Sequence, residues 1–183
     1  MSFEQSLAFG QLGEGYIARW LRRKGYHVLP VYEKHIKTGK GPQLFTADGS
    51  SLVAPDLFCF NSHNQIRWIE AKTKSAFTWY RNGGVWNTGI DLHHYEQYQK
   101  VDALTGWPVW LFFLQLPGEA KDTPPGKISP TGLYGNPLRV LVDNVCHKCP
   151  PEEYGRSGMV YWRPEHLTKH AELEEVLNIA EAH

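Results

Sequence analysis

The chain has 183 residues, of which 42% are apolar and 21% charged, the balance of a soluble globular domain with a continuous core. Its 19 basic and 19 acidic side chains cancel, so the total charge does not demand a nucleic-acid partner. Three cysteines are too few for a disulfide framework and the opening residues are too polar for a secretory signal, so we expect a reducing cytoplasm. The longest apolar run, 107–116, is about half the roughly 20 residues of a membrane helix, which argues against a membrane span.

Residues 3–24 are predicted to form the first helix. Ser2 and Gln5 resemble a capping box, and Gly25 is placed to end the helix. One face is traced by steps of four and three residues, and its members are Phe3, Leu7, Gly10, Glu14, Ile17 and Leu21. An ionised carboxylate is costly to bury alone. Glu14 therefore either lies at the edge of this face and reaches water, or meets a cation or strong donors.

Basic side chains are concentrated near the beginning of the chain and acidic ones near its end. A basic front suits phosphate binding, which depends on local charge. The alternative is a solvated helix face followed by a lysine-bearing loop. The basic residues are Arg19, Arg22, Arg23, Lys24, Lys34, Lys37 and Lys40, and the acids are Glu152, Glu153, Glu165, Glu172, Glu174, Glu175 and Glu181.

Three strands are predicted next, at 26–33, 53–60 and 65–73, with a long loop or splayed hairpin over 34–51. Pro55-Asp56 opens the second of these strands, and Glu70-Ala71-Lys72 closes the third. Side chains alternate along a strand, so Glu70 and Lys72 point the same way while Ala71 points into the opposite layer. Two adjacent strands can therefore bring Asp56, Glu70 and Lys72 to one place.

The chemistry of these three side chains is specific when they meet. Two carboxylates make a hard oxygen site for Mg²⁺, and a neighbouring lysine can orient a water or stabilise charge on a phosphate. That is the minimum apparatus for metal-dependent phosphodiester hydrolysis. The alternative is a solvated ion pair on a strand, preceded by an ordinary Pro-Asp turn.

The segment 73–90 combines polar and aromatic residues with Gly83-Gly84 as a pivot. It is either a hairpin whose aromatics cover the sheet or a surface that lines a substrate groove and stacks on bases. Asp91 can cap a second helix that ends at Gly106, and 107–116 is the next strand. The predicted order is thus α-β-β-β-α-β.

At this point the chain resembles the PD-(D/E)xK nuclease superfamily, which includes Holliday-junction resolvases and many restriction endonucleases. The resemblance covers roughly residues 10–115 and rests on Gly13-Glu14 in the first helix, Leu21 and Lys24-Gly25-Tyr26 before a strand, Pro55-Asp56, and Glu70-Ala71-Lys72. It implies an α/β fold of the restriction-endonuclease-like type, with a mixed central β-sheet flanked by α-helices. The segment 32–51 is longer than a compact member needs, and the chain after Leu116 matches nothing in the family.

The resemblance also implies roles for particular residues. Asp56 and Glu70 would bind Mg²⁺, with Mn²⁺ as a possible substitute, and Lys72 would be the catalytic lysine. Glu14 would be the helix-borne acid, and the backbone carbonyl of Ala71 would face the metal. Nucleic-acid contacts are expected from residues that follow the motif, and the candidates are Lys74, Arg81, His94, Tyr95 and Gln99.

Residues 117–183 are predicted to extend a core of about 1–116 within one nuclease domain. The proline-rich segment 116–137 is expected to be irregular, 138–142 and 159–162 to be edge strands, and 164–180 to be helical. Cys146-His147-Lys148-Cys149 has the spacing of half a zinc site, but a second pair is missing, so free thiols are the expected state.

The leading hypothesis is a metal-dependent deoxyribonuclease acting on DNA, with a homodimer possible as in relatives that cut both strands. RNA remains open as a substrate. Two alternatives are a non-catalytic nucleic-acid-binding protein of the same fold, and an unrelated α/β protein whose charged cluster is a structural ion pair. Substrate shape cannot be derived from this apparatus, because it depends on loops and oligomer geometry.

Overall fold

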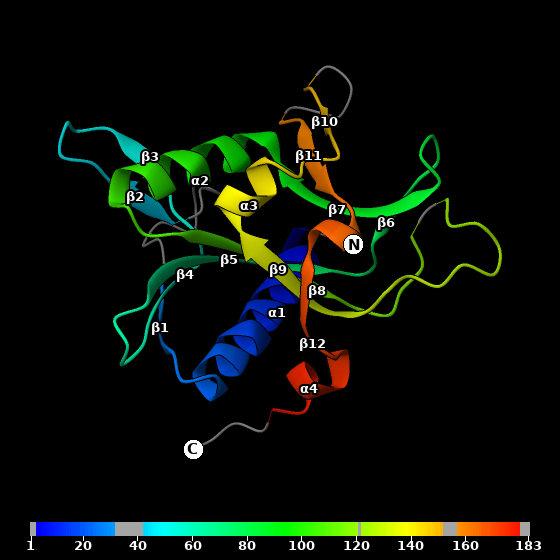
Figure 1. Cartoon of the computed structure of the whole chain (residues 1–183), viewed down its shortest axis with the longest axis horizontal. Coiled ribbons are helices and arrows are strands. Elements are labelled where there is room, and N and C mark those ends of the chain that lie inside the picture. Colours follow the sequence, from blue (N-terminus) through cyan, green and yellow to red (C-terminus); the bar gives the residue numbers. More distant parts are fainter. Residues whose placement is uncertain (1–2, 32–41, 121, 152–156, 180–183) are drawn as a thin grey trace.

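The computed structural model describes residues 3–31, 42–120, 122–151 and 157–179, although not the side chains of residues 3, 4 and 6. A six-stranded mixed sheet forms the middle of the molecule and carries helices on both faces, as Figure 1 shows. Its strands run in the order β1-β4-β5-β8-β9-β12. They span His27–Pro30 (β1), Leu57–Phe60 (β4), Ile66–Lys74 (β5), Val109–Gln115 (β8), Gly132–Pro137 (β9) and Thr168–Ala171 (β12).

The only parallel pair in this sheet is β5 with β8, and every other neighbouring pair is antiparallel. A parallel pair needs a long crossover, which here consists of a hairpin followed by helix α2 (Leu92–Thr105). The central elements α1, β1, β4, β5, α2 and β8 follow in the predicted α-β-β-β-α-β order. None of the described helices is long and apolar enough to cross a membrane.

Helix α1 (Phe3–Arg23) covers one face of the sheet together with the short helix α4 (Leu173–Leu177). Ile17, Trp20 and Leu21 are its buried apolar residues, whereas Leu7, predicted on the same face, is 45% exposed. The helix ends as predicted at Gly25, whose φ is +87°. The Tyr26 amide donates to the Leu21 carbonyl (3.1 Å) and the Gly25 amide to that of Arg22 (3.0 Å), which is a Schellman ending.

The opposite face carries α2, the short helix α3 (Leu138–Val142), a 3₁₀ turn at Pro164–His166, and a smaller sheet of order β10-β11-β7-β6. Its strands are β6 (Thr78–Tyr80), β7 (Val85–Asp91), β10 (His147–Cys149) and β11 (Met159–Trp162). The hairpin interpretation of 73–90 is therefore confirmed, since β6 and β7 pair across Gly83-Gly84. A further hairpin, β2 (Gln43–Phe45) with β3 (Ser51–Val53), falls in the segment expected to be a loop or splayed hairpin; its remaining residues up to 41 lie outside the described residues.

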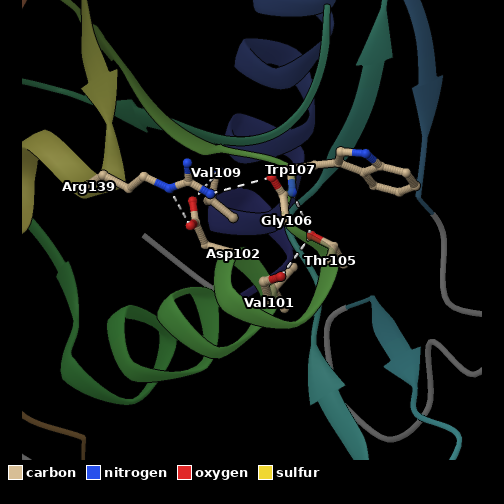
Figure 2. A network of polar contacts seen from close by, with 7 residues as sticks. All are labelled: Val101, Asp102, Thr105, Gly106, Trp107, Val109 and Arg139. Carbon is tan, nitrogen blue, oxygen red and sulfur yellow. Dashed lines mark hydrogen bonds and ion pairs between the residues drawn. The ribbon is translucent and has the colours of Figure 1, made fainter.

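A polar network fixes the far end of α2, as Figure 2 shows. Asp102 is 7% exposed, and its Oδ2 accepts a hydrogen bond from the Val109 amide at 2.9 Å. Its Oδ1 lies 2.7 Å from Nε of Arg139, which is the donor. Thr105 donates to the Val101 carbonyl at 2.8 Å, and the Gly106 amide closes the helix on the Asp102 carbonyl at 3.1 Å. This network joins α2 to the start of β8 and to α3.

Four secondary-structure predictions were wrong after residue 116. Residues 138–142 form helix α3, because Leu138 and Leu141 share a buried face while Val140 and Val142 are exposed. Gly132–Pro137, expected to be irregular, is strand β9, in which Gly135 allows the close approach of β8; a Cβ there would lie 2.5 Å from the Leu111 carbonyl oxygen.

The third error concerns 164–180, which contains β12 and only a short helix, because Thr168–Ala171 pairs with β9. The fourth is the position of Met159–Trp162, which is an inner strand between β10 and β7. A fifth correction concerns Asp91: its side chain makes no capping hydrogen bond to α2 and instead accepts one from Ser157 at 2.7 Å.

Candidate active site

Asp56 and Glu70 meet because β4 and β5 are antiparallel neighbours. Leu57 lies opposite Ile69 in this pair, so the register carried one residue further places Asp56 opposite Glu70. The Asp56 carboxylate accepts a hydrogen bond from the Ala71 amide, with Oδ2 3.0 Å from the nitrogen. That hydrogen bond fixes the carboxylate against β5 at the position where β4 begins.

Glu70 is the most buried charged side chain of the site, with 0% of its surface exposed. Its neighbour on the same strand face, Lys72, places its ammonium 2.5 Å from Oε1. Among the described residues neither Glu70 oxygen makes a hydrogen bond of good geometry, although the Tyr98 hydroxyl lies within reach. As the alternation predicts, Ala71 points away and packs in the core under α1.

Glu14 reaches the same place from α1. Gly13 makes this possible, because a Cβ at that position would overlap the Thr73 hydroxyl; the helix therefore lies directly on the end of β5. Glu14 is half-buried, and its nearest charged neighbours are Glu70 and Lys72. The prediction that Glu14 meets a cation and the Asp56/Glu70 pair agrees with this placement.

The three carboxylates repel one another in a region of low water content. Burial, followed by the charge of Glu70, raises the pKa of Asp56 well above its usual range, against the opposing effects of Lys72 and the Ala71 amide. The same two causes raise the pKa of Glu14. Repulsion of this kind marks a site that favours added positive charge.

Two lysines follow on the same face of β5 and behave differently. Burial opposes the charge of Lys72, but Glu70 and Asp56 outweigh it and raise the pKa of the ammonium, which stays protonated at neutral pH. Burial and the neighbouring Lys72 lower the pKa of Lys74 to about 8. Lys74 therefore lies at the edge of the cluster, where Asp91 and Glu70 partly offset these causes.

Helix α2 contributes a different tyrosine from the one predicted. Tyr95 is 3% exposed and packs against Trp162 in the core, so it does not face the carboxylates. One turn on, Tyr98 lies beside Glu70, and burial together with Glu70 and Asp56 raises the pKa of its hydroxyl. His94 stacks near Tyr98 (ring centroids 5.7 Å apart), and burial together with Lys72 lowers its pKa.

The remaining nucleic-acid candidates lie apart from the carboxylates. Gln99 is half-buried, donates to the Tyr95 carbonyl (3.4 Å), and lines a hollow with Asp102 and Arg139. Arg81 is 69% exposed at the tip of the β6–β7 hairpin and pairs with Asp122. Sequence reasoning also missed the contribution of Asp91, whose charge acts on Lys72, Lys74 and His94. The available signal was its place at the end of β7, directly before α2.

The described residues contain no group of three or more His, Cys, Asp and Glu side chains gathered closely enough to hold a metal ion by themselves. Cys146 directly precedes β10 and Cys149 is its last residue, and the expectation about zinc at these two cysteines stays a prediction. The carboxylates of Asp56 and Glu70 nevertheless fit Mg²⁺, which binds through one or two carboxylates and keeps waters and substrate oxygens as its other ligands. The incompletely satisfied, buried Glu70 oxygens are the observation that supports this fit.

The fold has a counterpart among solved structures. Hjc, a Holliday junction resolvase from the archaeal hyperthermophile Archaeoglobus fulgidus, is similar to this chain with a TM-score of 0.51 and 12% identity. The similarity covers 91% of this chain and 93% of that one. At this identity the likeness concerns the fold, and it confirms the predicted α/β architecture of a mixed sheet flanked by helices. No family model and no curated protein sequence matches the chain.

Proposed function

We propose that this protein is a Mg²⁺-dependent nuclease of the PD-(D/E)xK superfamily that hydrolyses phosphodiester bonds in DNA. The observation that carries the proposal is the meeting of Asp56, Glu70 and Lys72 on one strand face, with Glu14 added from α1. The fold shared with a Holliday junction resolvase supports it independently. Residues 1–183 act as one nuclease domain, with a core of about 1–116 extended by the rest of the chain, in a reducing cytoplasm.

Asp56, Glu70 and the Ala71 carbonyl would hold the metal, and Glu14 would support the ion or its hydration shell. A bound Mg²⁺ or Mn²⁺ supplies Lewis acidity at the scissile phosphate and lowers the pKa of a water. Glu14 and Asp56 have raised pKa values without a metal. A cation that replaces their protons would therefore relieve the repulsion among the carboxylates.

Lys72 acts as a fixed positive charge. Its ammonium is held 2.5 Å from Oε1 of Glu70, and its side chain is 30% exposed. Protonated at neutral pH, it stabilises negative charge that develops on the phosphate and orients the attacking water. Tyr98 keeps Glu70 in position by its hydroxyl, and Lys74 and His94 border the path by which a phosphate approaches.

The experiment is a cleavage assay on a panel of linear, supercoiled circular, single-stranded and four-way branched DNA, with an RNA arm. Each substrate is incubated with Mg²⁺, with Mn²⁺, and with EDTA. The variant Asp56→Asn keeps the shape of the side chain and removes its charge; Glu96→Gln removes a carboxylate from the exposed face of α2 and is the matched control.

We expect metal-dependent cleavage of at least one DNA substrate, reduced about a hundredfold or more by Asp56→Asn and unchanged by Glu96→Gln. Full activity in Asp56→Asn, or cleavage that persists in EDTA, would contradict the proposal. Cleavage of RNA alone would retain the mechanism and replace the substrate. A gel-filtration profile of the active protein tests the homodimer expected of an enzyme that cuts both strands.

A further inference from the structure

The smaller sheet presents one face that the proposed chemistry does not use. Cross-strand partners point to the same side, and Thr78 lies opposite Asn87 while Tyr80 lies opposite Val85. By the same rule Tyr161 lies over Gly89, and His147 lies opposite Tyr161. These strands enclose a pocket of about 290 Å³, which is the lower end of the roughly 300–1,000 Å³ of small-ligand sites.

Three rings form one wall of this pocket. His147 stacks on Tyr80 with ring centroids 4.5 Å apart and on Tyr161 at 4.6 Å, both within 20° of parallel. Gly89 is required for the stack, because a Cβ there would lie 2.2 Å from the Val160 carbonyl oxygen and 2.8 Å from the Tyr161 ring. The backbone of β7 thus makes room for the aromatic wall, and the outer faces of the two tyrosines are where we expect a planar ligand to stack.

A buried amide provides the polar group. Asn87 lines the pocket and is 2% exposed, and its Oδ1 has no hydrogen-bond partner among the described residues. A buried acceptor without a partner is costly, so a ligand that donates a hydrogen bond to Oδ1 gains the full benefit of satisfying it. Arg81, which is paired with Asp122 and 69% exposed, also lines the pocket, and a guanidinium can bind a ligand phosphate.

Strand β7 connects this pocket to the carboxylate cluster. Asn87 and Asp91 are four residues apart on the same strand, which places them about 13 Å from each other at 3.2–3.4 Å per residue. Asp91 is the residue whose charge acts on Lys72 and Lys74. A nucleic-acid strand whose phosphate occupies the site can therefore place a nearby base in the pocket.

We infer that the pocket of Tyr80, Asn87, His147 and Tyr161 binds one unstacked adenine of the nucleic-acid substrate, and this inference rests on the proposed function. Stacking on the aromatic wall accepts any base. The Asn87 amide adds selectivity, because asparagine pairs bidentately with adenine, accepting from N6 and donating to N7. Thymine can offer Oδ1 only its N3–H and carries a carbonyl where adenine has N6, so it lacks the N6–N7 pair that asparagine recognises.

The test measures binding without cleavage, so that it does not depend on catalysis. Fluorescein-labelled pentadeoxyadenylate and pentadeoxythymidylate are titrated with the full chain in EDTA, and anisotropy gives both dissociation constants. The variants are Asn87→Leu, which fills the same space without the amide, Tyr80→Leu, which removes the ring from edge strand β6, and Tyr80→Phe, which keeps it. Glu96→Gln, on the exposed face of α2, is the matched control.

We expect the unaltered protein to prefer the adenine oligonucleotide by about fivefold or more. Asn87→Leu abolishes the preference, Tyr80→Leu weakens the binding of both oligonucleotides about tenfold, and Tyr80→Phe and Glu96→Gln leave both the affinity and the preference unchanged. An unchanged preference in Asn87→Leu, unchanged affinity in Tyr80→Leu, or no binding to either oligonucleotide overturns the inference. Should Asn87→Leu fail to fold, the adenine preference of the unaltered protein and the comparison of Tyr80→Leu with Tyr80→Phe test the inference.

The two proposals fail separately. Metal-dependent cleavage with an inert pocket leaves the nuclease standing and removes the adenine site. Adenine-selective binding without cleavage of any substrate keeps the pocket and removes the catalytic assignment.

Discussion

Two buried carboxylates, Asp102 near the C-terminal end of helix α2 and Glu70 beside Tyr98 of the same helix, have opposite surroundings. Asp102 has each oxygen matched: Val109 donates to one at 2.9 Å and Arg139 to the other at 2.7 Å. Glu70 is more deeply buried, and its charged partner is the Lys72 ammonium, with the Tyr98 hydroxyl beside it. The nearest other charged groups include two carboxylates, Asp56 and Glu14, that add repulsion.

The contrast separates a structural acid from one kept for chemistry. A satisfied buried carboxylate stabilises the fold, whereas a cluster with surplus negative charge destabilises the metal-free protein and is expected where a cation or a reaction needs it. Figure 2 shows that the Asp102 network joins α2, β8 and α3, and it therefore stabilises the fold. The Asp56/Glu70 cluster gathers side chains around Lys72, whose side chain is 30% exposed.

The largest expected effect is on catalysis. Lys72→Met keeps the length of the side chain and removes the charge, so kcat should fall about a hundredfold or more. The control Lys100→Met, on the exposed part of α2, should cleave normally. Initial cleavage rates at saturating DNA measure the difference, and normal turnover in Lys72→Met would make the lysine a structural partner of Glu70.

The next effect is on stability and concerns the other carboxylate. Asp102→Ala leaves the Val109 amide and the Arg139 guanidinium without their acceptor, which should cost about 1–3 kcal/mol of unfolding free energy. Because each kcal/mol corresponds to about 2–4 °C in a chain of this size, thermal denaturation resolves the loss. Turnover per folded molecule should be unchanged; a variant that loses activity at full stability would place Asp102 in the chemistry.

A smaller effect of opposite sign is expected at Asp56. A carboxyl whose pKa is raised in the folded state loses stability as pH rises from its ordinary value of 3.8 toward the folded value. Without metal, Asp56→Asn should therefore melt higher than the unaltered protein at pH 7, by about 2–4 °C if the gain is about 1 kcal/mol. This difference in melting temperature should shrink as the pH falls toward 4. A lower melting temperature at pH 7 would show that the charge is already compensated.

The smallest effect concerns Lys74. Its pKa of about 8 lies below the ordinary 10.5, so its charge is lost as pH rises through 8, and the folded state becomes relatively more stable between about 8 and 10.5. Lys74→Met should weaken DNA binding at pH 7 and reduce the salt slope of the binding constant by about one. The DNA affinities of the variant and the unaltered protein should become equal at pH 9. An equal difference at both pH values would remove Lys74 from the phosphate path.

The charged motif was readable from the sequence because strand alternation is a local property. Asp56, Glu70 and Lys72 required only that two strands pair, and the end of α1 required only Gly25. Helix α2 was harder, because tyrosines and histidines occur around much of its circumference. Periodicity could not decide between Tyr95 and Tyr98, and packing against Trp162 settles the choice.

The chain after residue 116 was predicted least well, because tertiary contacts override local propensity there. Leu138–Val142 is rich in β-branched residues and still forms a helix, since two leucines three residues apart face the core. Gly132–Pro137 contains residues that are rare in strands, yet its glycine at 135 is what lets β9 approach β8. The single-domain division into a core and an extension stays a prediction.

Calorimetric titration of Mn²⁺ into the metal-free protein at pH 7.5 tests the central claim most directly, with Asp56→Asn and Asp102→Asn titrated beside it. We predict saturable binding to the unaltered protein and to Asp102→Asn, and binding weakened at least about tenfold in Asp56→Asn. Equal binding by all three proteins, or no binding by any, would contradict a metal centre at Asp56 and Glu70.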